Sequence, residues 1–351
     1  MPRATPVLPS GPSRAETPMA FIRAMVQAYE RRGLSPDAAL AKAQIPPPLL
    51  RQADARVTAL QMEWMSEAAM RELDDEALGW FDRQLPWGSY GMLVRASLSA
   101  PTLGVALARW CRHHGLLTDH IGLRLQRDGA LAHLTLTEHR PLHNAQHHWQ
   151  ELCVVSVLRN AMGVAQWLID SQLRLHQVQL AFAPPAHASA YAVLFDGPVC
   201  FDAHQHRLSF DAGYLGLPVK RDEAALQRML QRALLLTVRP YRRDRLLRER
   251  VRALLLGGQG GPGPAATAAD LAEALHVSER TLHRQLKDEG ASLQAIKDSV
   301  RRQRAEELLQ RSRKPIKHIA AEVGFGSEKS FIRAFRGWTG QTPDGFRQAS
   351  F

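Results

Sequence analysis

SERTLHRQL, the stretch Ser278–Leu286, has a close counterpart further along the chain in SEKSFIRAF, the stretch Ser327–Phe335. Together they read S-E-[R/K]-[T/S]-[L/F]-x-R-x-[L/F], and each follows a short run whose apolar residues have helical spacing. A helix, a short turn, a capping Ser and a second helix with an outward Arg are typical of a helix-turn-helix. A single pattern of this kind is often only a helical hairpin in a core. The tandem pair therefore carries the prediction of a DNA-binding protein.

The first copy predicts a helix with one apolar face and one cationic face. We expect Ser278 to cap this helix by accepting a backbone N–H that has no partner within it. Leu282 and Leu286 lie four residues apart, so they face the core. The side chains that fall mostly on the opposite face are Arg280, His283 and Arg284.

The second copy predicts the same arrangement with aromatic residues in the core. Ser327 is the expected cap, and Phe331 and Phe335 face inward four residues apart. Gly324 stands where the preceding helix needs a left-handed residue at its end. The outward side chains here are Lys329, Ser330 and Arg333.

The spacing between the copies indicates related units of unequal turn length. Ser327 follows Ser278 by 49 residues, whereas Ile319 follows its counterpart Leu271 by 48, which leaves Gly326 as an extra residue in the second turn. We expect the first helix-turn-helix at about 267–289, the second at about 315–338, and one long helix at about 292–311 between them. A rigid linking helix would allow one chain to contact successive major grooves, roughly 34 Å apart.

The preceding part of the chain has a mixed pattern. Apolar residues have helical spacing in 19–80, 99–119 and 145–168, with a helix start expected at Ser99-Ala100-Pro101. Alternation in 122–126 and 131–137 predicts a β-hairpin, and further strands are expected in 173–182, 199–201 and 207–210. The predicted fold class is therefore an α+β domain over 19–215, followed by a helical connector and an all-α C-terminal domain.

Composition narrows the class of protein without deciding it. The chain has 351 residues, a formal net charge of +11 and a sequence pI of about 10.1, which favours a polyanionic partner. Its three scattered Cys residues fit a reducing cytoplasm and predict no disulfide framework. Residues 1–18 are expected to be a disordered tail rather than a signal peptide, and no apolar run approaches the roughly 18 residues of a membrane span.

Histidines supply the main alternative to a purely DNA-binding protein. His139, His143, His147 and His148 cluster in the sequence, and His143 and His147 have the i, i+4 spacing of helical metal ligands. No nearby Cys or carboxylate completes a metal site, and no P-loop or dinucleotide fingerprint is present. We therefore assign no catalytic residue, no metal and no cofactor. An enzyme or metal-binding domain fused to a DNA-targeting module, and an effector-independent DNA-binding protein, stay open as alternatives.

Residues 250–351 resemble the DNA-binding domain of the AraC/XylS family of bacterial transcription regulators. The likeness rests on Ile319–Phe325 and on the ending Gly340–Arg347, which is similar to the family's G-x-[ST]-P-x-x-[FY]-R. It implies that this all-α domain spans 250–351 with Arg250–Leu256 as its first helix, and that 216–249 is the helical connector before it. The Gly/Pro stretch 257–264, which composition alone predicts to be the interdomain linker, would then be an enlarged internal loop. The domain boundary would lie nearer Pro240, where a helix break is also expected. His276 departs from the family pattern, where Gly or a similar residue is common.

The same resemblance implies roles for the outward residues. In this family they read bases, which assigns DNA binding to Arg280, His283, Arg284, Lys329, Ser330 and Arg333, with the caps Ser278 and Ser327 near phosphates. Residues 19–215 resemble the N-terminal domain of the ornithine-utilisation-regulator-like, arabinose-binding-domain-type subgroup, through Ser99–Gly104 and Val199–Asp202. That likeness implies a homodimer that binds a small-molecule effector of unknown identity. The family resemblance as a whole implies a transcription activator that contacts RNA polymerase, in the cytoplasm that the Cys usage indicates.

Overall fold

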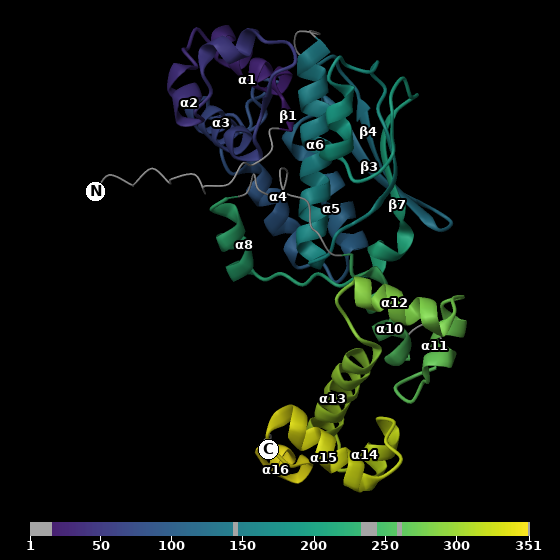
Figure 1. The fold of residues 1–351 in the computed structure, drawn as a ribbon. Helices are drawn as coiled ribbons and strands as arrows, with labels where there is room; N and C mark the ends of the chain where they lie inside the picture. Colours follow the sequence, from purple (N-terminus) through teal and green to yellow (C-terminus); the bar gives the residue numbers. More distant parts are fainter. Residues whose placement is uncertain (1–15, 143–146, 233–243, 258–261, 350–351) are drawn as a thin grey trace. The chain divides into compact units, whose positions relative to one another are not determined.

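The structure, a computed structural model, describes residues 16–142, 147–232, 244–257 and 262–349 (Figure 1). The chain folds as two units, Met1–Arg242 and Arg243–Phe351. The boundary that the sequence predicted between residues 249 and 250 falls inside helix α10 (Leu246–Leu255). The second unit begins earlier because Val251 and Leu255 of α10 are buried in its core. The break predicted at Pro240, within the expected connector, lies outside the described residues.

The N-terminal unit contains a five-stranded sheet in the order β3-β4-β7-β5-β6 and a two-stranded sheet of β1 and β2. All pairings in the larger sheet are antiparallel except that of β5 with β6. The strands are β1 Thr17–Pro18, β2 Arg56–Val57, β3 Ile121–Asp128, β4 Leu131–Glu138, β5 Leu175–Gln179, β6 Val199–Cys200 and β7 His206–Asp211. The helices are α1 Met19–Arg31, α2 Asp37–Lys42, α3 Ala59–Glu72, α4 Ser89–Leu98, α5 Leu103–Leu117, α6 His147–Ile169, α7 Tyr191–Leu194 and α8 Glu223–Leu230, with short 3₁₀ turns at Pro47–Arg51, Ala188–Ala190 and Ala212–Gly216.

The predicted hairpin is present as β3 and β4, joined at a turn where Gly129 has a φ of +55°. In β4 the alternate residues Ala132, Leu134 and Leu136 are buried, which is the period of two that the sequence displays. Helix α5 packs against β3 and against α6. The mixed sheet and helices confirm the α+β class predicted for this part of the chain.

Two local expectations for the N-terminal unit are wrong. Helix α5 is capped by Thr102, whose hydroxyl accepts from the Val105 N–H at 3.5 Å, while Ser99 ends the preceding helix α4. Residues 17–18 belong to β1, paired with β2, so the tail cannot extend to residue 18, and residues 1–15 lie outside the described residues. Among the described residues, one helix segment, Trp149–Ile169 of α6, is long and apolar enough to cross a membrane by length and composition, but Glu151 and Arg159 interrupt it and 78% of its most apolar 18 residues are buried, as in a core helix.

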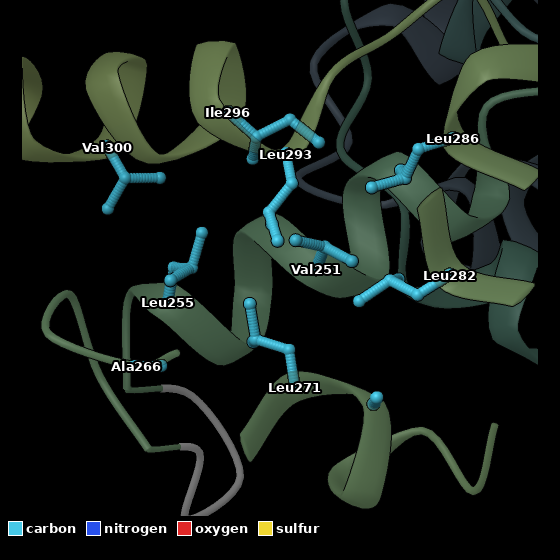
Figure 2. Close-up of a cluster of buried hydrophobic side chains, with 10 residues drawn as sticks. Val251, Leu255, Ala266, Leu271, Leu282, Leu286, Leu293, Ile296 and Val300 are labelled. Carbon is cyan, nitrogen blue, oxygen red and sulfur yellow. The ribbon is translucent and has the colours of Figure 1, made fainter. Parts of the chain in front are cut away.

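The C-terminal unit is built along one long helix, α13 (Leu293–Arg311). One core gathers Leu293, Ile296 and Val300 of α13 with side chains of α10, α11 and α12 (Figure 2). A second core gathers Ala305 and Leu309 of α13 with side chains of α14 and α15. The remaining helices are α11 Ala268–Ala274, α12 Glu279–Asp288, α14 Ile316–Glu322, α15 Glu328–Thr339 and α16 Pro343–Ala349. This is the predicted all-α fold of two helix pairs joined by a long helix.

The turns of the two helix pairs solve the same backbone problem with different residues. Gly324 ends α14 with a φ of +87°, and His276 occupies the equivalent position after α11 with a φ of +55°. The left-handed region costs a non-glycine residue about 1–2 kcal/mol. The departure from glycine at His276 therefore leaves the turn geometry intact but strained.

Gly324 also allows a close approach between the two halves of the C-terminal unit. A Cβ atom at this position would lie 3.0 Å from the Pro264 carbonyl oxygen and 3.1 Å from the Ala265 Cα. Arg301 of α13 contacts both sides of this close approach. Its Nε donates to the Pro264 oxygen at 3.3 Å, and its guanidinium lies 5.1 Å from the centre of the Phe325 ring. The loop before α11 is thus held against the turn of the second helix pair.

We expect Gly324→Ala to destabilise the C-terminal unit by about 1–2 kcal/mol or more, because it adds both left-handed strain and a clash with backbone. Gly326→Ala is the matched control, since a Cβ atom added at Gly326 would meet nothing within 4 Å and the φ of this residue is not positive. Hydrogen exchange of peptides from α14 and α15 in the full chain measures the difference. Equal protection in the two variants would contradict the close-approach explanation.

Candidate nucleic-acid interface

The two recognition helices begin with the same capping geometry. The Ser278 hydroxyl accepts from the Thr281 N–H at 3.2 Å and lies 2.9 Å from the Thr281 hydroxyl. The Ser327 hydroxyl accepts from the Ser330 N–H at 3.2 Å and donates to the Ser330 hydroxyl at 2.9 Å. Each cap satisfies one of the backbone N–H groups that a helix start leaves without a partner. The sequence repeat is therefore a repeat of local structure.

The inner faces of α12 and α15 anchor the two helices in separate cores. Leu282 and Leu286 are fully buried in the first core, and Phe331 and Phe335 are fully buried in the second. Because these pairs are four residues apart, each fixes the rotation of its helix about the helix axis. The rotation then determines which side chains point outward.

The outer faces carry every residue that the sequence assigned to DNA binding. Arg280, His283, Arg284, Lys329, Ser330 and Arg333 are all exposed. In the described part of the chain, no carboxylate lies within ion-pair distance of Arg280, Arg284, Lys329 or Arg333. Their charges are therefore available to an external anion. Ser330 differs from the others, because its hydroxyl is already engaged by the Ser327 cap.

The two outer faces are related but not identical. With the offset of 49 residues, Arg280 corresponds to Lys329 and Arg284 corresponds to Arg333. His283, however, corresponds to the half-buried Ile332. A hollow beside α15 is lined by Lys329, Arg333 and Arg336 together with four neighbouring residues. Both helices therefore present positive charges at two equivalent positions. They differ in the shape and polarity of the side chain at the third.

Helix α13 sets the separation of the two recognition helices. Its 19 residues correspond to a length of about 28 Å at the usual rise per residue. Its first half is buried against α12 and its second half against α15. This length is of the same order as the roughly 34 Å between successive major grooves on one face of DNA.

Two side chains that support this arrangement were not identified from the sequence. Glu289, at the end of α12, accepts from the backbone N–H groups of Leu247 at 3.0 Å and Arg248 at 2.9 Å, and so caps the start of α10. The second is Arg301 of α13, whose bond to Pro264 holds the loop before α11. Neither role has a local sequence signal, because each partner lies more than 35 residues away.

The histidine-rich region does not assemble a metal site among the residues that the structure describes. No group of three or more His, Cys, Asp or Glu side chains is placed to hold a metal ion there. His139 is described, but His143 and the side chains of His147 and His148 lie outside the described residues.

Comparison with known proteins assigns both units. The family model for the arabinose-binding domain of AraC transcription regulators matches residues 33–219, and a helix-turn-helix domain model matches residues 271–349. The chain belongs to the AraC family of transcription regulators. It is 30% identical over 336 residues to the ornithine utilization regulator of Pseudomonas aeruginosa, covering 95% of this chain and 96% of that protein. It is also 36% identical over 103 residues to the regulator VqsM of the same organism, covering 29% of this chain and 31% of VqsM.

Solved structures of AraC-type regulators are also similar to this chain. The crystal structure of the regulator CdpR from Pseudomonas aeruginosa is 24% identical, with a TM-score of 0.34, and the match covers 91% of this chain and 98% of CdpR. The DNA-binding domain of AdpA, crystallised with a target DNA, is 27% identical, with a TM-score of 0.25, and the match covers 29% of this chain and 90% of that domain. Family membership establishes a DNA-binding regulator with an N-terminal effector-binding domain.

Loss of either cap should destabilise its own helix pair. We expect Ser278→Ala and Ser327→Ala each to cost about 1 kcal/mol, because an N–H at the helix start loses its acceptor. Ser278→Asn and Ser327→Asn are the matched controls, since Asn retains the acceptor and should stay within a few tenths of a kcal/mol of the native protein. Hydrogen exchange of α12 and α15 peptides tests this prediction. Unchanged protection of α12 in Ser278→Ala and of α15 in Ser327→Ala would show that the caps are not stabilising.

Proposed function

We propose that this AraC-family protein is a transcription activator in which α12 and α15 read two successive major grooves of one operator half-site. The observation that carries the proposal is the pair of recognition helices on one continuous helix, each with exposed cations at equivalent positions. Two recognition helices held rigidly by α13 favour binding to two short DNA sequences at a fixed distance over binding to a single short sequence.

The residues proposed to contact DNA divide by chemistry. Arg280, Arg284 and Arg333 can each donate two hydrogen bonds to a guanine, and Lys329 can donate to the same base edge. His283 can donate to a base or stack on one. The Ser330 hydroxyl accepts a hydrogen bond from Ser327, so it can still donate its own proton to DNA. The backbone N–H groups at the capped helix starts suit phosphate oxygens.

The effector-binding domain is proposed to control how this reader engages the operator. As expectations that follow the family, we assign a homodimer, contact with RNA polymerase and a cytoplasmic location. The relatives are transcriptional regulators, and we propose no enzymatic activity for this chain. The effector does not follow from the name of the ornithine utilization regulator, which describes that protein alone.

Footprinting should detect two protected segments per subunit, centred about one helical turn, or roughly 10 base pairs, apart on one face of the DNA. The reason is the fixed separation of α12 and α15 along α13. Hydroxyl-radical cleavage of the operator bound to the full-length protein gives the pattern. Protection of a single groove per subunit would contradict simultaneous reading by both helices.

Arg284→Ala and Arg333→Ala should each reduce operator binding by about 5- to 150-fold, the equivalent of roughly 1–3 kcal/mol of lost base discrimination. Binding to random DNA of equal length should fall much less, because only one charge is lost. Arg313→Ala is the matched control, since Arg313 is an arginine between α13 and α14, outside both recognition helices.

Fluorescence anisotropy at one fixed salt concentration measures all the complexes. Equal losses on operator and random DNA would identify Arg284 and Arg333 as phosphate contacts rather than base readers.

A further inference from the structure

A cavity of about 180 Å³ lies within the N-terminal unit among helices α1, α3, α4, α6 and α8. Its wall is largely apolar, with methionines contributed by three different helices, Met25, Met70 and Met229. Methionine side chains adapt readily to the shape of what they contact. Enclosure by helices and an apolar wall with a few polar groups are the usual properties of a small-molecule site.

One positively charged side chain lines this largely apolar cavity. Arg159 of α6 lines the cavity, and its guanidinium donates to the Leu194 carbonyl oxygen. Burial lowers the pKa of Arg159 to about 10, so the side chain is still charged at neutral pH. A guanidinium has five N–H donors, so a bond within the protein is compatible with a bond to a ligand. A charge kept at an apolar wall is costly, and an anionic ligand would offset that cost.

A second polar group in the wall has no acceptor among the residues that the structure describes. Trp80 lines the cavity and is 3% exposed, and its indole N–H makes no hydrogen bond to any of those residues. Buried N–H groups are nearly always bonded, and leaving one without an acceptor is unfavourable. The cavity therefore adjoins a buried donor that a ligand oxygen could satisfy.

The acidic group of the wall is already used by the fold. Glu76 accepts from the Gly88 N–H at 2.7 Å and from the Tyr90 N–H at 2.8 Å, at the start of α4. Its two oxygens thereby serve as acceptors for the first turn of that helix. The Arg159 guanidinium supplies a positive charge at the wall, and the Trp80 N–H supplies a donor without an acceptor among the described residues, which favours an acceptor ligand over an amine.

We propose that this cavity is the effector site and that it takes a small carboxylic acid with an apolar body. The carboxylate would accept from Arg159 and Trp80, and the body would lie against the methionines. A cavity of roughly 150 Å³ holds benzene, so a volume of about 180 Å³ fits a compound of roughly eight to ten non-hydrogen atoms. This inference rests on the proposed effector control of DNA binding.

Helix α8 gives such a ligand a route to the rest of the chain. Met229 and Leu230 of α8 line the cavity, and α8 is the last helix described before the chain enters the C-terminal unit. Two ion pairs join the segment 223–232 to other helices of the N-terminal unit. Glu223 pairs with Arg95 of α4 at 2.7 Å, and Arg232 pairs with Glu63 of α3 at 2.7 Å. A ligand that packs against Met229 and Leu230 would strengthen the same attachment.

The test uses the full-length protein with hexanoate and benzoate as probes, and with hexanol, benzyl alcohol, hexylamine and ornithine as comparisons. Isothermal titration and thermal unfolding measure binding, and anisotropy on the operator measures its consequence. We expect hexanoate or benzoate to bind saturably, to raise the unfolding temperature and to change operator affinity. Their affinity should exceed that of the neutral alcohols at least tenfold.

Two kinds of variant distinguish the site from a general effect on folding. Arg159→Gln should remove the tenfold preference for carboxylate over alcohol, whereas Arg159→Lys should retain part of it. Ser66→Phe places a ring in the cavity wall and should abolish binding of every probe, although Ser66 is far from Arg159 in sequence. Hydrogen exchange of α5 and β3, which belong to the same unit as Arg159 and Ser66, serves as the folding control for all three variants.

Several results would overturn the proposal. They are preferential binding of hexylamine or ornithine, equal binding of alcohol and acid, unchanged selectivity in Arg159→Gln, or no binding of any probe. Carboxylate binding without a change in operator affinity would overturn the assignment of the cavity as the effector site. Failure of the proposed DNA reading is separate, because it is measured on the operator without any probe.

Discussion

The C-terminal unit depends on one constraint, the division of α13 between two cores. Val300 closes the apolar stripe of the first core and Ala305 opens that of the second, and the helix continues without interruption between them. Because side chains on one helix keep fixed angular positions, burial of both halves fixes the direction in which α12 and α15 present their outer faces. Arg301, between the two stripes, adds a bond to the loop before α11. The two readers therefore cannot rotate independently.

Cations have opposite physical roles in the two units. On α12 and α15 the arginines are exposed and their interactions depend on salt, which suits rapid, reversible association with DNA. In the N-terminal unit Arg159 lies beside an apolar cavity, where a single charge interacts more strongly with a nearby anion because little water screens it. Arginine thus contributes to an exposed, positively charged surface in the C-terminal unit. In the N-terminal unit it contributes a single charge at the proposed effector site.

The sequence predicted features that rest on neighbouring residues and missed those that rest on distant ones. The Ser278 and Ser327 caps and the inward Phe331 and Phe335 follow from spacings of three and four residues, which are visible in the chain. The hairpin of β3 and β4 was likewise predictable from its alternation. The insertion of β7 between β4 and β5 was not, because it joins strands about 70 and 30 residues apart in the chain.

The candidate site divides in the same way between local and distant signals. The exposed side chains of α12 and α15 could be predicted because each helix carries its own motif. Arg159 and Trp80 line one cavity only through the packing of separate segments, so no motif marks them. The start of α5 was misplaced because Ser99 and Thr102 are both good caps near Pro101, and only the packing of α4 shows that Ser99 ends one helix while Thr102 begins the next.

The two helix pairs differ in how firmly their turns are held. Gly324 takes its left-handed conformation without strain and lies against Pro264 and Ala265, whereas His276 takes the same conformation at a cost. The strained turn belongs to the first pair, whose core includes α10, the first helix described after the connection between the units. Glu289 couples α10 to the end of α12 through two backbone N–H groups. The two recognition helices are therefore joined to α13 through turns of unequal strain.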